Sequence, residues 1–296
     1  MTAAIVADHA GKRYGRRWAL QDCSLEIPAG RVVGLVGANG AGKTTLLHLV
    51  VGLLTPTAGN VTTLGGVPGA TPDALARVGF LAQDAPVYAS LSVKDHLKLG
   101  ARLNTGWDGD AAEARIDELE LDRKQRAGTL SGGQRAQLAL TLAVCKRPEL
   151  LVLDEPVAGL DPLARREFLK WLMRDVTEHD MTVLLSSHLL ADIERVCDYL
   201  VVLASSHVRL AGDADDLLAH HRRLVGPRRD APPGVDVIDE SHTERQSTFV
   251  VRTSQPIIDP AWSVQEIGLE DLVLAHLGYG IDDEQREPLR AVGGLR

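Results

Sequence analysis

The residues Gly37-Ala38-Asn39-Gly40-Ala41-Gly42-Lys43-Thr44 match the phosphate-binding pattern G-x-x-x-x-G-K-[ST]. The apolar run at residues 32–36 precedes this stretch, and residues 44–51, which can form a helix, follow it. The pattern requires strand, glycine loop and helix in this order, because the loop N–H groups and the helix N-terminus must face the same phosphates. The stretch therefore predicts a P-loop at the end of a strand.

Lys43 and Thr44 carry the side-chain chemistry of this loop. In a P-loop the lysine ammonium contacts the β- and γ-phosphates, and the hydroxyl of the next residue can ligate Mg²⁺. Backbone N–H groups from Gly40 to Thr45 would point inward, with glycine wherever a Cβ would block the phosphates. A chance glycine turn is the alternative, which the flanking strand and helix disfavour. We therefore expect ATP and Mg²⁺ as ligands.

Two carboxylates, Asp154 and Glu155, follow the apolar run at residues 150–153. A carboxylate at the end of a buried strand is costly unless a cation or hydrogen-bond donors meet it. In a P-loop protein the natural cation is the Mg²⁺ of the nucleotide, and a second carboxylate can orient or deprotonate the attacking water. A helix-capping pair is the structural alternative. Behind a P-loop, the pattern favours Asp154 as a metal ligand and Glu155 as the base.

A second glycine-containing stretch, Leu130-Ser131-Gly132-Gly133-Gln134, precedes a helix-forming run at residues 135–144. Serine caps helices well, so a plain N-cap with flexible glycines is one interpretation. The other is a second anion site at a helix N-terminus, suited to a γ-phosphate. Because the P-loop already surrounds the phosphates in its own subunit, a second site makes sense if it covers an ATP bound to another subunit.

Two further polar residues, His188 and Gln83, each end an apolar stretch. His188 follows the run at residues 182–185, near the γ-phosphate if the sheet is parallel, although a lone histidine is more often structural. Gln83 follows the run at residues 78–81, where a neutral amide could contact Mg²⁺ or the attacking water. Spacing alone does not decide between the functional and the structural role of Gln83.

The distribution of apolar runs predicts an α/β fold. Strand-like runs recur at residues 150–153, 182–185 and 199–203, and a helical stretch at 162–177 lies between two of them. Strands that alternate with helices predict a mostly parallel sheet with crossovers. The first thirty residues contain short strands with turns and are expected to form an antiparallel β edge layer.

A helical insert is predicted between the P-loop half and the second glycine loop. Ser92, with Asp95 three residues later, resembles a capping box. Asp108 can cap a second helix, which carries Ile116 and Leu119 on one face.

Changes in composition indicate the domain boundaries. Gly226-Pro227 and Pro232-Pro233-Gly234 are typical of a linker. Strands at 235–238 and 248–252 and a helix at 268–277 are expected after it. The expected parts are an ATPase domain at residues 1–218 with a helical subdomain at about 84–140, a linker at 219–234, a small C-terminal α+β accessory domain at 235–280, and a disordered tail at 281–296.

Charge and cysteine content limit the possible partners of this 296-residue chain. Its formal net charge of −8 argues against broad nucleic-acid binding, which favours a basic surface. The three cysteines are far apart and form no C-x-x-C pair, so no zinc or disulfide framework is predicted. We find no signal-peptide pattern and no apolar run near the roughly 18–20 residues that span a bilayer. Any link to a membrane is therefore expected to go through a partner.

In the order of these motifs, the chain resembles the ATP-binding subunit of an ABC transporter over roughly residues 3–215. The resemblance identifies 37–44 as Walker A, 130–134 as the unaltered LSGGQ signature and 150–154 as Walker B. It implies that Glu155 is the catalytic base and His188 the switch histidine. The site residues that it implies are Glu155, His188, Gln83 and Lys43 for catalysis; Tyr14 (stacked on adenine), Gly37, Asn39, Gly40, Ala41, Gly42, Lys43, Thr44 and Thr45 for the nucleotide; Thr44, Gln83 and Asp154 for the metal; and Ser131, Gly132, Gly133, Gln134 and the D-loop residue Asp161 in trans.

The resemblance also implies partners and a mechanism. Two such domains face each other head to tail, and each ATP lies between the Lys43 loop of one subunit and the Ser131 loop of the other. A homodimer is expected, and the segment at 84–91 would pass motion to an integral membrane permease. The chain would then lie in the cytoplasm, on the inner face of the plasma membrane. Residues 268–278 look like the ending of ABC-2 export ATPases, and a dimerisation or regulatory element is the alternative for this helix.

We therefore expect an ATPase subunit that energises the export of a small molecule, drug or lipid. An importer subunit is the alternative within the family, and a soluble ABC ATPase that acts on ribosomes, DNA or iron–sulfur assembly is an alternative of another class. The ribosome type has two ATPase halves in one chain, and the DNA-repair types contain long coiled coils or zinc modules. A non-catalytic nucleotide-binding module is a third alternative, against which Glu155 and His188 argue.

Overall fold

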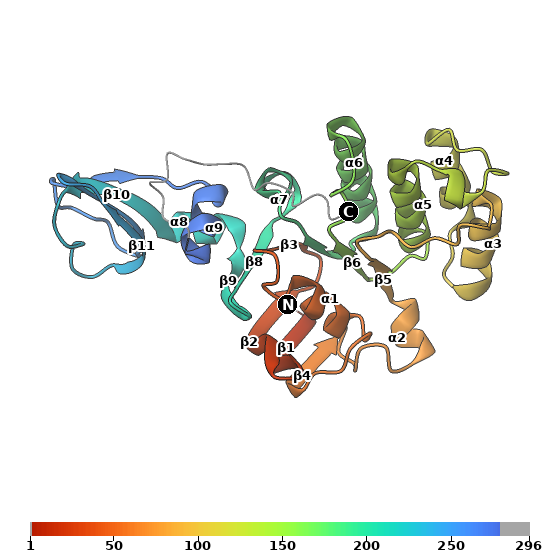
Figure 1. The fold of residues 1–296 in the computed structure, drawn as a ribbon, viewed down its shortest axis with the longest axis horizontal. Helices are drawn as coiled ribbons and strands as arrows, with labels where there is room; N and C mark the ends of the chain where they lie inside the picture. Colours follow the sequence, from red (N-terminus) through yellow and green to blue (C-terminus); the bar gives the residue numbers. More distant parts are fainter. Residues whose placement is uncertain (1, 279–296) are drawn as a thin grey trace. The chain divides into compact units, whose positions relative to one another are not determined.

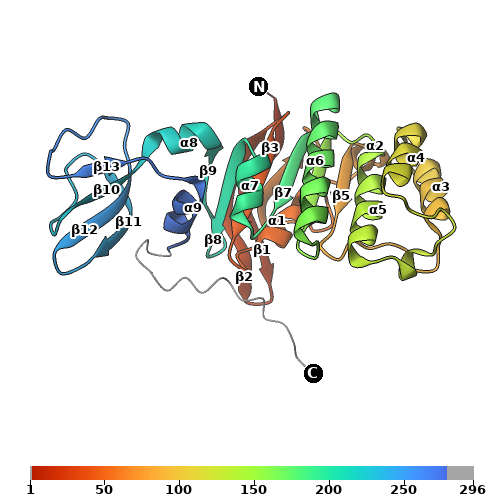
Figure 2. The same ribbon diagram turned by 90° about the horizontal axis from the view of Figure 1, so that it is seen from above.

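The computed structural model describes residues 2–278, and the chain divides into two compact units, Met1–Ala214 and Asp215–Arg296. Figures 1 and 2 show the helices and strands of both units from two directions. Within the described residues, no helix is both long enough and apolar enough to cross a membrane.

The first unit is built on a six-stranded sheet with the strand order β5-β6-β7-β3-β8-β9. Its first five strands are parallel, and β9 pairs antiparallel with β8. Every residue of β3, β6 and β7 is buried, as continuous apolar runs predict for strands that are covered on both faces. The predicted parallel sheet with crossovers is confirmed. The strands are β3 (Val32–Gly37), β5 (Val78–Leu81), β6 (Leu150–Asp154), β7 (Thr182–Ser186), β8 (Tyr199–Ala204) and β9 (His207–Asp213).

A separate antiparallel sheet, of strand order β2-β1-β4, confirms the predicted edge layer. It is formed by β1 (Ala3–Tyr14), β2 (Arg17–Pro28) and β4 (Ala58–Thr63). Helix α1 (Lys43–Val50) contributes Leu46 and Leu47 to one hydrophobic core that also contains residues of both sheets. The start of α1 is therefore held between the two layers.

Other helices cover the six-stranded sheet, and Figure 2 shows two of them, α6 and α7, side by side. Helix α7 (Leu190–Val196) packs closely on β3, since a Cβ at Gly34 would lie 2.6 Å from Ile193 Cγ2. The longer helix α6 (Pro162–His179) confirms the helical stretch that we expected at 162–177. The short helix α2 (Pro72–Ala76) leads into β5.

Three helices, α3 (Val93–Leu103), α4 (Gly109–Glu118) and α5 (Gly132–Val144), share a core of their own. Figure 1 shows them together at one end of the first unit. The predicted caps are confirmed: Ser92 and Asp95 form a capping box, and the Asp108 side chain accepts a hydrogen bond from the Ala111 N–H. Such caps contribute about 1 kcal/mol each. Ile116 is fully buried in this core, and Leu119 packs against it.

The second unit is a four-stranded antiparallel sheet of order β11-β12-β10-β13, with helix α9 packed on β11. The strands expected near 235–238 and 248–252 and the helix expected at 268–277 are present. The tail that we expected at 281–296 lies outside the described residues, as does the end of the expected accessory domain. The elements are α8 (Ala214–His220), β10 (His221–Pro227), β11 (Asp236–His242), β12 (Gln246–Arg252), β13 (Ser263–Gln265) and α9 (Leu269–Leu277).

The linker that we expected at 219–234 is wrong for residues 221–227, which form strand β10. This strand pairs with β12 on one side and β13 on the other. Gly226 does not mark a flexible break. A Cβ there would lie 2.5 Å from Trp262 Cε3, so the glycine permits close packing of the Trp262 ring. Pro227 ends the strand, and the second unit therefore starts earlier than the composition indicated.

Two histidines lie against each other in the second unit. His221 is 1% exposed, and the centroid of its ring lies 5.6 Å from that of His276 in an edge-to-face arrangement. Its Nδ1 lies 2.6 Å from the Leu217 carbonyl oxygen. Among the described residues, the buried Nε2 atom of neither histidine has a hydrogen-bond partner. Burial lowers the pKa of both imidazoles, that of His276 to about 4, and the nearby Arg252 lowers both further.

These depressed pKa values predict that the second unit loses stability in weak acid. An unfolded histidine has a pKa of about 6.5, so the unfolded state binds protons first as the pH falls from there towards 4. The free energy of unfolding should therefore fall across this window, by up to about 1.4 kcal/mol per pH unit for each histidine, and level off above it. Hydrogen exchange of the β12 amides, converted to free energies between pH 5 and 7.5, measures this slope.

His276→Phe keeps a ring in the cluster and should flatten the slope. The exposed neighbour His220→Gln is the matched control and should leave the slope unchanged. A free energy of unfolding that does not depend on pH in the unaltered chain would contradict the assignment.

Candidate active site

The loop between β3 and α1 is shaped by two glycines with left-handed backbone. Gly40 has φ of 80° and Gly42 has φ of 109°, which other L-residues rarely adopt. A Cβ at Gly42 would overlap the Ala19 carbonyl oxygen of β2. A Cβ at Gly37 would lie 2.5 Å from the Leu203 carbonyl oxygen of β8. Packing against β8 and β2 therefore requires glycine at Gly37 and Gly42.

The Lys43 side chain turns back across this loop and is only 8% exposed. Its Nζ atom donates a hydrogen bond to the Gly37 carbonyl oxygen at 2.8 Å and lies 3.7 Å from Oε1 of Glu155. A buried ammonium is stable only with such partners. Thr44, in the first turn of α1, is exposed, and Thr45 is half-buried. The loop thus has a cation held beneath it and a hydroxyl at its surface.

Asp154 and Glu155 lie at the carboxyl end of β6, both with less than a tenth of their surface exposed. In the parallel register Asp154 lies opposite Ser186, the last residue of β7. The Ser186 hydroxyl donates to Asp154 Oδ1 at 2.7 Å and accepts the Glu155 N–H at 2.8 Å. These bonds offset the desolvation of the polar groups at this strand end. Ser186 is a site residue that the sequence analysis missed.

His188 extends the chain of polar contacts towards solvent. Its Nδ1 lies 2.6 Å from Oε2 of Glu155, and its backbone N–H donates to the same oxygen at 3.3 Å. The His188 side chain is 43% exposed, whereas Glu155 is 10% exposed by the same measure. Lys43, Glu155 and His188 therefore form one connected series. In such a series the carboxylate can orient water, and the ammonium can stabilise the negative charge that develops in phosphoryl transfer.

Gln83 and Gly132 lie beside this series, where they and Glu155 line the same cavity of about 170 Å³. Gln83 is exposed, just beyond the end of β5. Tyr14 is 51% exposed at the turn between β1 and β2. This turn approaches the P-loop, because a Cβ at Gly40 would lie 4.0 Å from Arg17 Nη2. The structure thus places Gln83 and Gly132 beside Glu155 and the Tyr14 turn beside the P-loop, without fixing their roles.

The second glycine loop starts helix α5, and its serine is an N-cap, as one interpretation predicted. Ser131 and Gln134 form a complete capping box. Both views show α5 beside α3 and α4 and apart from α1. Gly132 has open space around it, with no atom within 4 Å of an added Cβ. Asp161 is the exposed N-cap of α6, and its Oδ1 accepts two backbone N–H groups.

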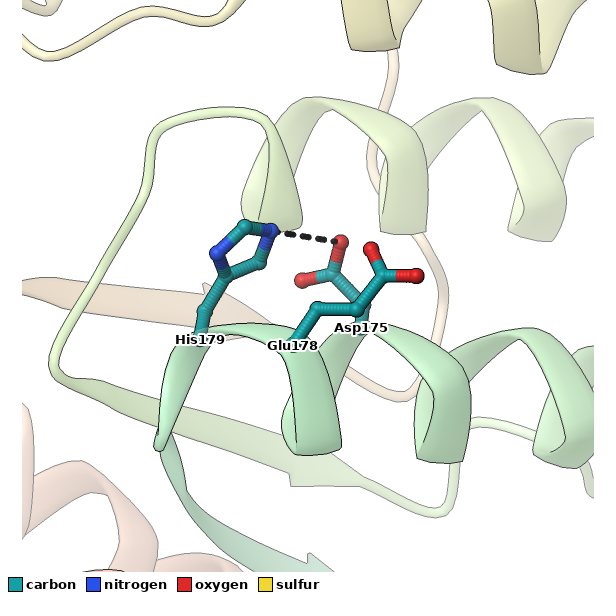
Figure 3. Close-up of side chains that lie close together, drawn as sticks. All are labelled: Asp175, Glu178 and His179. Atoms are coloured by element: carbon teal, nitrogen blue, oxygen red, sulfur yellow. Dashed lines mark ion pairs between the residues drawn. The ribbon is translucent and has the colours of Figure 1, made fainter.

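A different cluster, Asp175, Glu178 and His179, lies at the other end of α6 (Figure 3). His179 Nε2 lies 3.7 Å from Asp175 Oδ1, and the same oxygen accepts a hydrogen bond from Arg147 Nη1 at 3.2 Å. Arg147 also pairs with Asp108 at 2.6 Å. Burial raises the pKa of Asp175, and Arg147 opposes that shift. The cluster therefore belongs to an ion-pair network in which Arg147 links Asp175 of α6 to Asp108, the N-cap of α4.

Comparison with known proteins shows the family of this chain. The chain is 36% identical over 228 residues to the Nod factor export ATP-binding protein I of Cupriavidus pinatubonensis (strain JMP 134 / LMG 1197). These aligned residues cover 74% of this chain and 69% of that protein. The chain belongs to the ABC transporter ATP-binding proteins. The family model described as ABC transporter matches residues 20–158 of this ATP-binding subunit.

Two further similarities agree with this assignment. The bacitracin transport ATP-binding protein BcrA of Enterococcus faecalis is 31% identical over 228 residues, which cover 76% of this chain and 74% of that one. A solved structure of an ATP-binding subunit of an ABC transporter aligns with a TM-score of 0.66 at 27% identity, covering 74% of this chain and 92% of that one. This ABC ATPase hydrolyses ATP to power transport by a membrane permease.

The structure predicts opposite results for alanine at two glycines of the motifs. Gly42→Ala should abolish ATP binding by the single subunit, because the new Cβ overlaps the Ala19 carbonyl and the left-handed backbone costs about 1–2 kcal/mol more. Gly132→Ala, the matched control, should leave the fold and single-subunit ATP binding unchanged, because its surroundings are open. A fluorescent ATP analogue and a thermal melt measure both. Normal binding by Gly42→Ala would refute this account of the loop.

Proposed function

We propose that two copies of this chain close head to tail around two ATP molecules, each held by the Lys43 loop of one copy and the Ser131 loop of the other. The connected series Lys43–Glu155–His188 is the observation that carries this proposal. It supplies a complete hydrolytic side of the site in one subunit. The Ser131 loop begins helix α5, whose N-terminal N–H groups suit an anion, and α5 lies apart from α1 in the same chain.

Within this site, Glu155 is the base that receives the proton of the attacking water, and His188 holds Glu155 in position at 2.6 Å. Lys43 moves from the Gly37 carbonyl to the phosphates when ATP binds. Asp154, Thr44 and Gln83 would supply the oxygen ligands that Mg²⁺ prefers. Bound Mg²⁺ would neutralise charge on the β- and γ-phosphates. Gln83 would thereby connect the metal with the surface beyond β5.

The remaining contacts to the nucleotide come from the loop and from the first sheet. Tyr14 stacks on adenine, which its exposure at the turn beside Gly40 permits. Asp161 contributes in trans, to the ATP site of the other copy. The nucleotide is otherwise held by the P-loop residues Gly37, Asn39, Gly40, Ala41, Gly42, Lys43, Thr44 and Thr45, and in trans by Ser131, Gly132, Gly133 and Gln134.

The partner is an integral membrane permease, which holds this chain at the cytoplasmic face of the membrane. The segment at 84–91 is the proposed docking surface, and its Tyr88 side chain is 64% exposed. Burying an exposed aromatic side chain supplies much of the energy of such interfaces. The relatives with export and bacitracin transport in their names support outward movement of a small molecule, drug or lipid.

Replacing the base should separate ATP binding from hydrolysis. Glu155→Gln retains the shape but not the basicity, so ATP should bind and trap a stable dimer that turns over at least about 100-fold more slowly. Size-exclusion chromatography with ATP and a phosphate-release assay measure the two effects. Turnover at the normal rate would reject Glu155 as the base.

A mixing experiment tests the site shared by two subunits. Lys43→Ala and Ser131→Arg chains are each expected to be inactive, whereas a mixed dimer regains one intact composite site and up to half the activity. Differently tagged chains, purified through both tags, prove that mixed dimers are present. Proven mixed dimers without ATPase activity would contradict the arrangement in trans.

The partner class is tested by affinity capture from detergent-solubilised cells. An integral membrane protein should be recovered with the unaltered chain and reduced with Tyr88→Ala, whose ATP binding should be normal. Leu163→Ala, at another exposed apolar residue, is the control and should not reduce recovery. Recovery of ribosomes or DNA in place of a membrane protein would favour the soluble ATPase, and a solute-uptake system would favour the importer.

A further inference from the structure

Ser186 links the Asp154 carboxylate and the Glu155 backbone through a single hydroxyl. Its side chain is completely buried at the end of β7. The hydroxyl donates to Asp154 Oδ1 at 2.7 Å and accepts the Glu155 N–H at 2.8 Å. No motif in the sequence analysis includes this residue.

The two bonds use the hydroxyl in complementary ways. A serine hydroxyl has one proton to donate and lone pairs with which to accept. Its proton is directed to the Asp154 carboxylate, and the Glu155 N–H can only be donated towards a lone pair. The rotation of the hydroxyl and the orientation of the Asp154 carboxylate are therefore set together.

The backbone of Glu155 needs this support. Its φ of 49° lies in the left-handed region, which costs a non-glycine residue about 1–2 kcal/mol. Without Ser186 the Glu155 N–H would also lose its partner in a buried place. This strained turn directs the Glu155 carboxylate to Lys43 and His188. Loss of the Ser186 hydroxyl would therefore alter the position of both carboxylates, that of Asp154 directly and that of Glu155 through its backbone.

We propose that Ser186 is a positioning residue that aligns the metal-binding Asp154 and the base Glu155 as one rigid pair. The inference rests on the roles proposed above for these two carboxylates. Ser186 touches neither ATP nor metal in this proposal and acts only through its neighbours. Loss of its hydroxyl should therefore weaken the response to Mg²⁺ and slow turnover together, beyond any effect on folding.

The test compares Ser186→Ala, Ser186→Thr and Ser186→Val in the full-length chain, with ATPase rates measured across a Mg²⁺ titration. Outer-shell groups of this kind are worth about 10- to 100-fold in metal affinity or activity. The Ala and Val variants should raise the Mg²⁺ concentration at half-maximal rate by about 10-fold and lower kcat by about 10- to 100-fold. Thr has the shape of Val but keeps the hydroxyl, so it should restore both values.

Thr182→Val is the matched control on the same strand. Thr182 is 2% exposed, and its hydroxyl accepts the Gly30 N–H at 2.9 Å, at the end of β7 away from the site. This variant also loses a buried hydroxyl, and it should lower the melting temperature while leaving the Mg²⁺ constant and kcat unchanged. If Ser186 contributed to stability alone, its Ala and Val variants would also lower the melting temperature and leave the Mg²⁺ constant and kcat unchanged.

Three results would overturn the inference. The first is a Ser186→Ala chain with an unchanged Mg²⁺ constant and kcat, and the second is equal activity of the Thr and Val variants. The third is failure of both Ala and Val variants to fold while Thr182→Val folds, which would make the hydroxyl a requirement of the fold. Asp154→Asn and Glu155→Gln distinguish failure of this inference from failure of the proposed function. If these two variants retain full Mg²⁺-dependent activity, the proposed roles of the carboxylates are wrong, whatever Ser186 does.

Discussion

The parallel pairing of β6, β7 and β3 is the constraint on which the site depends. These strands are buried along their whole length, so a charged side chain is tolerated only where a strand ends. Because parallel strands end at the same edge, Asp154, Ser186 and the P-loop meet there. Glu155 then reaches both Lys43 and His188, although these residues are far apart in the chain. A shift of one residue in the β6–β7 register would separate Asp154 from the Ser186 hydroxyl.

The glycines of the two motifs differ in what requires them. Gly37 and Gly42 are needed by the subunit's own packing, since strands β8 and β2 leave no space for a Cβ. Gly132 has open surroundings, and the fold of one subunit does not explain it. A glycine without a structural requirement is consistent with close approach by something outside the subunit. The two loops thus differ in what the packing of the subunit requires of their glycines.

Much of this arrangement was predictable, because local patterns and local structure agree. The caps at Ser92 and Asp108 and the buried strands follow from interactions between residues that are close in sequence or from uniform apolar composition. The linker prediction was wrong for a non-local reason. Gly226 permits contact with Trp262, whereas in the sequence it is indistinguishable from a glycine that permits flexibility. Ser186 was missed because its partners come from another strand.

The sequence by itself determined the family, the α/β class, the P-loop and the identity of the residues that could bind nucleotide or metal. These depend on short spacings, and the chemistry of each motif is contained in its own residues. Only the tertiary structure decided which of them contact one another. Lys43 and His188 both reach the Glu155 carboxylate, and the Ser186 hydroxyl binds both the Asp154 carboxylate and the Glu155 backbone N–H. The physical reason is that hydrogen bonds and ion pairs act over a few ångströms. Strand register, set by the burial of whole strands, brings distant residues within that range.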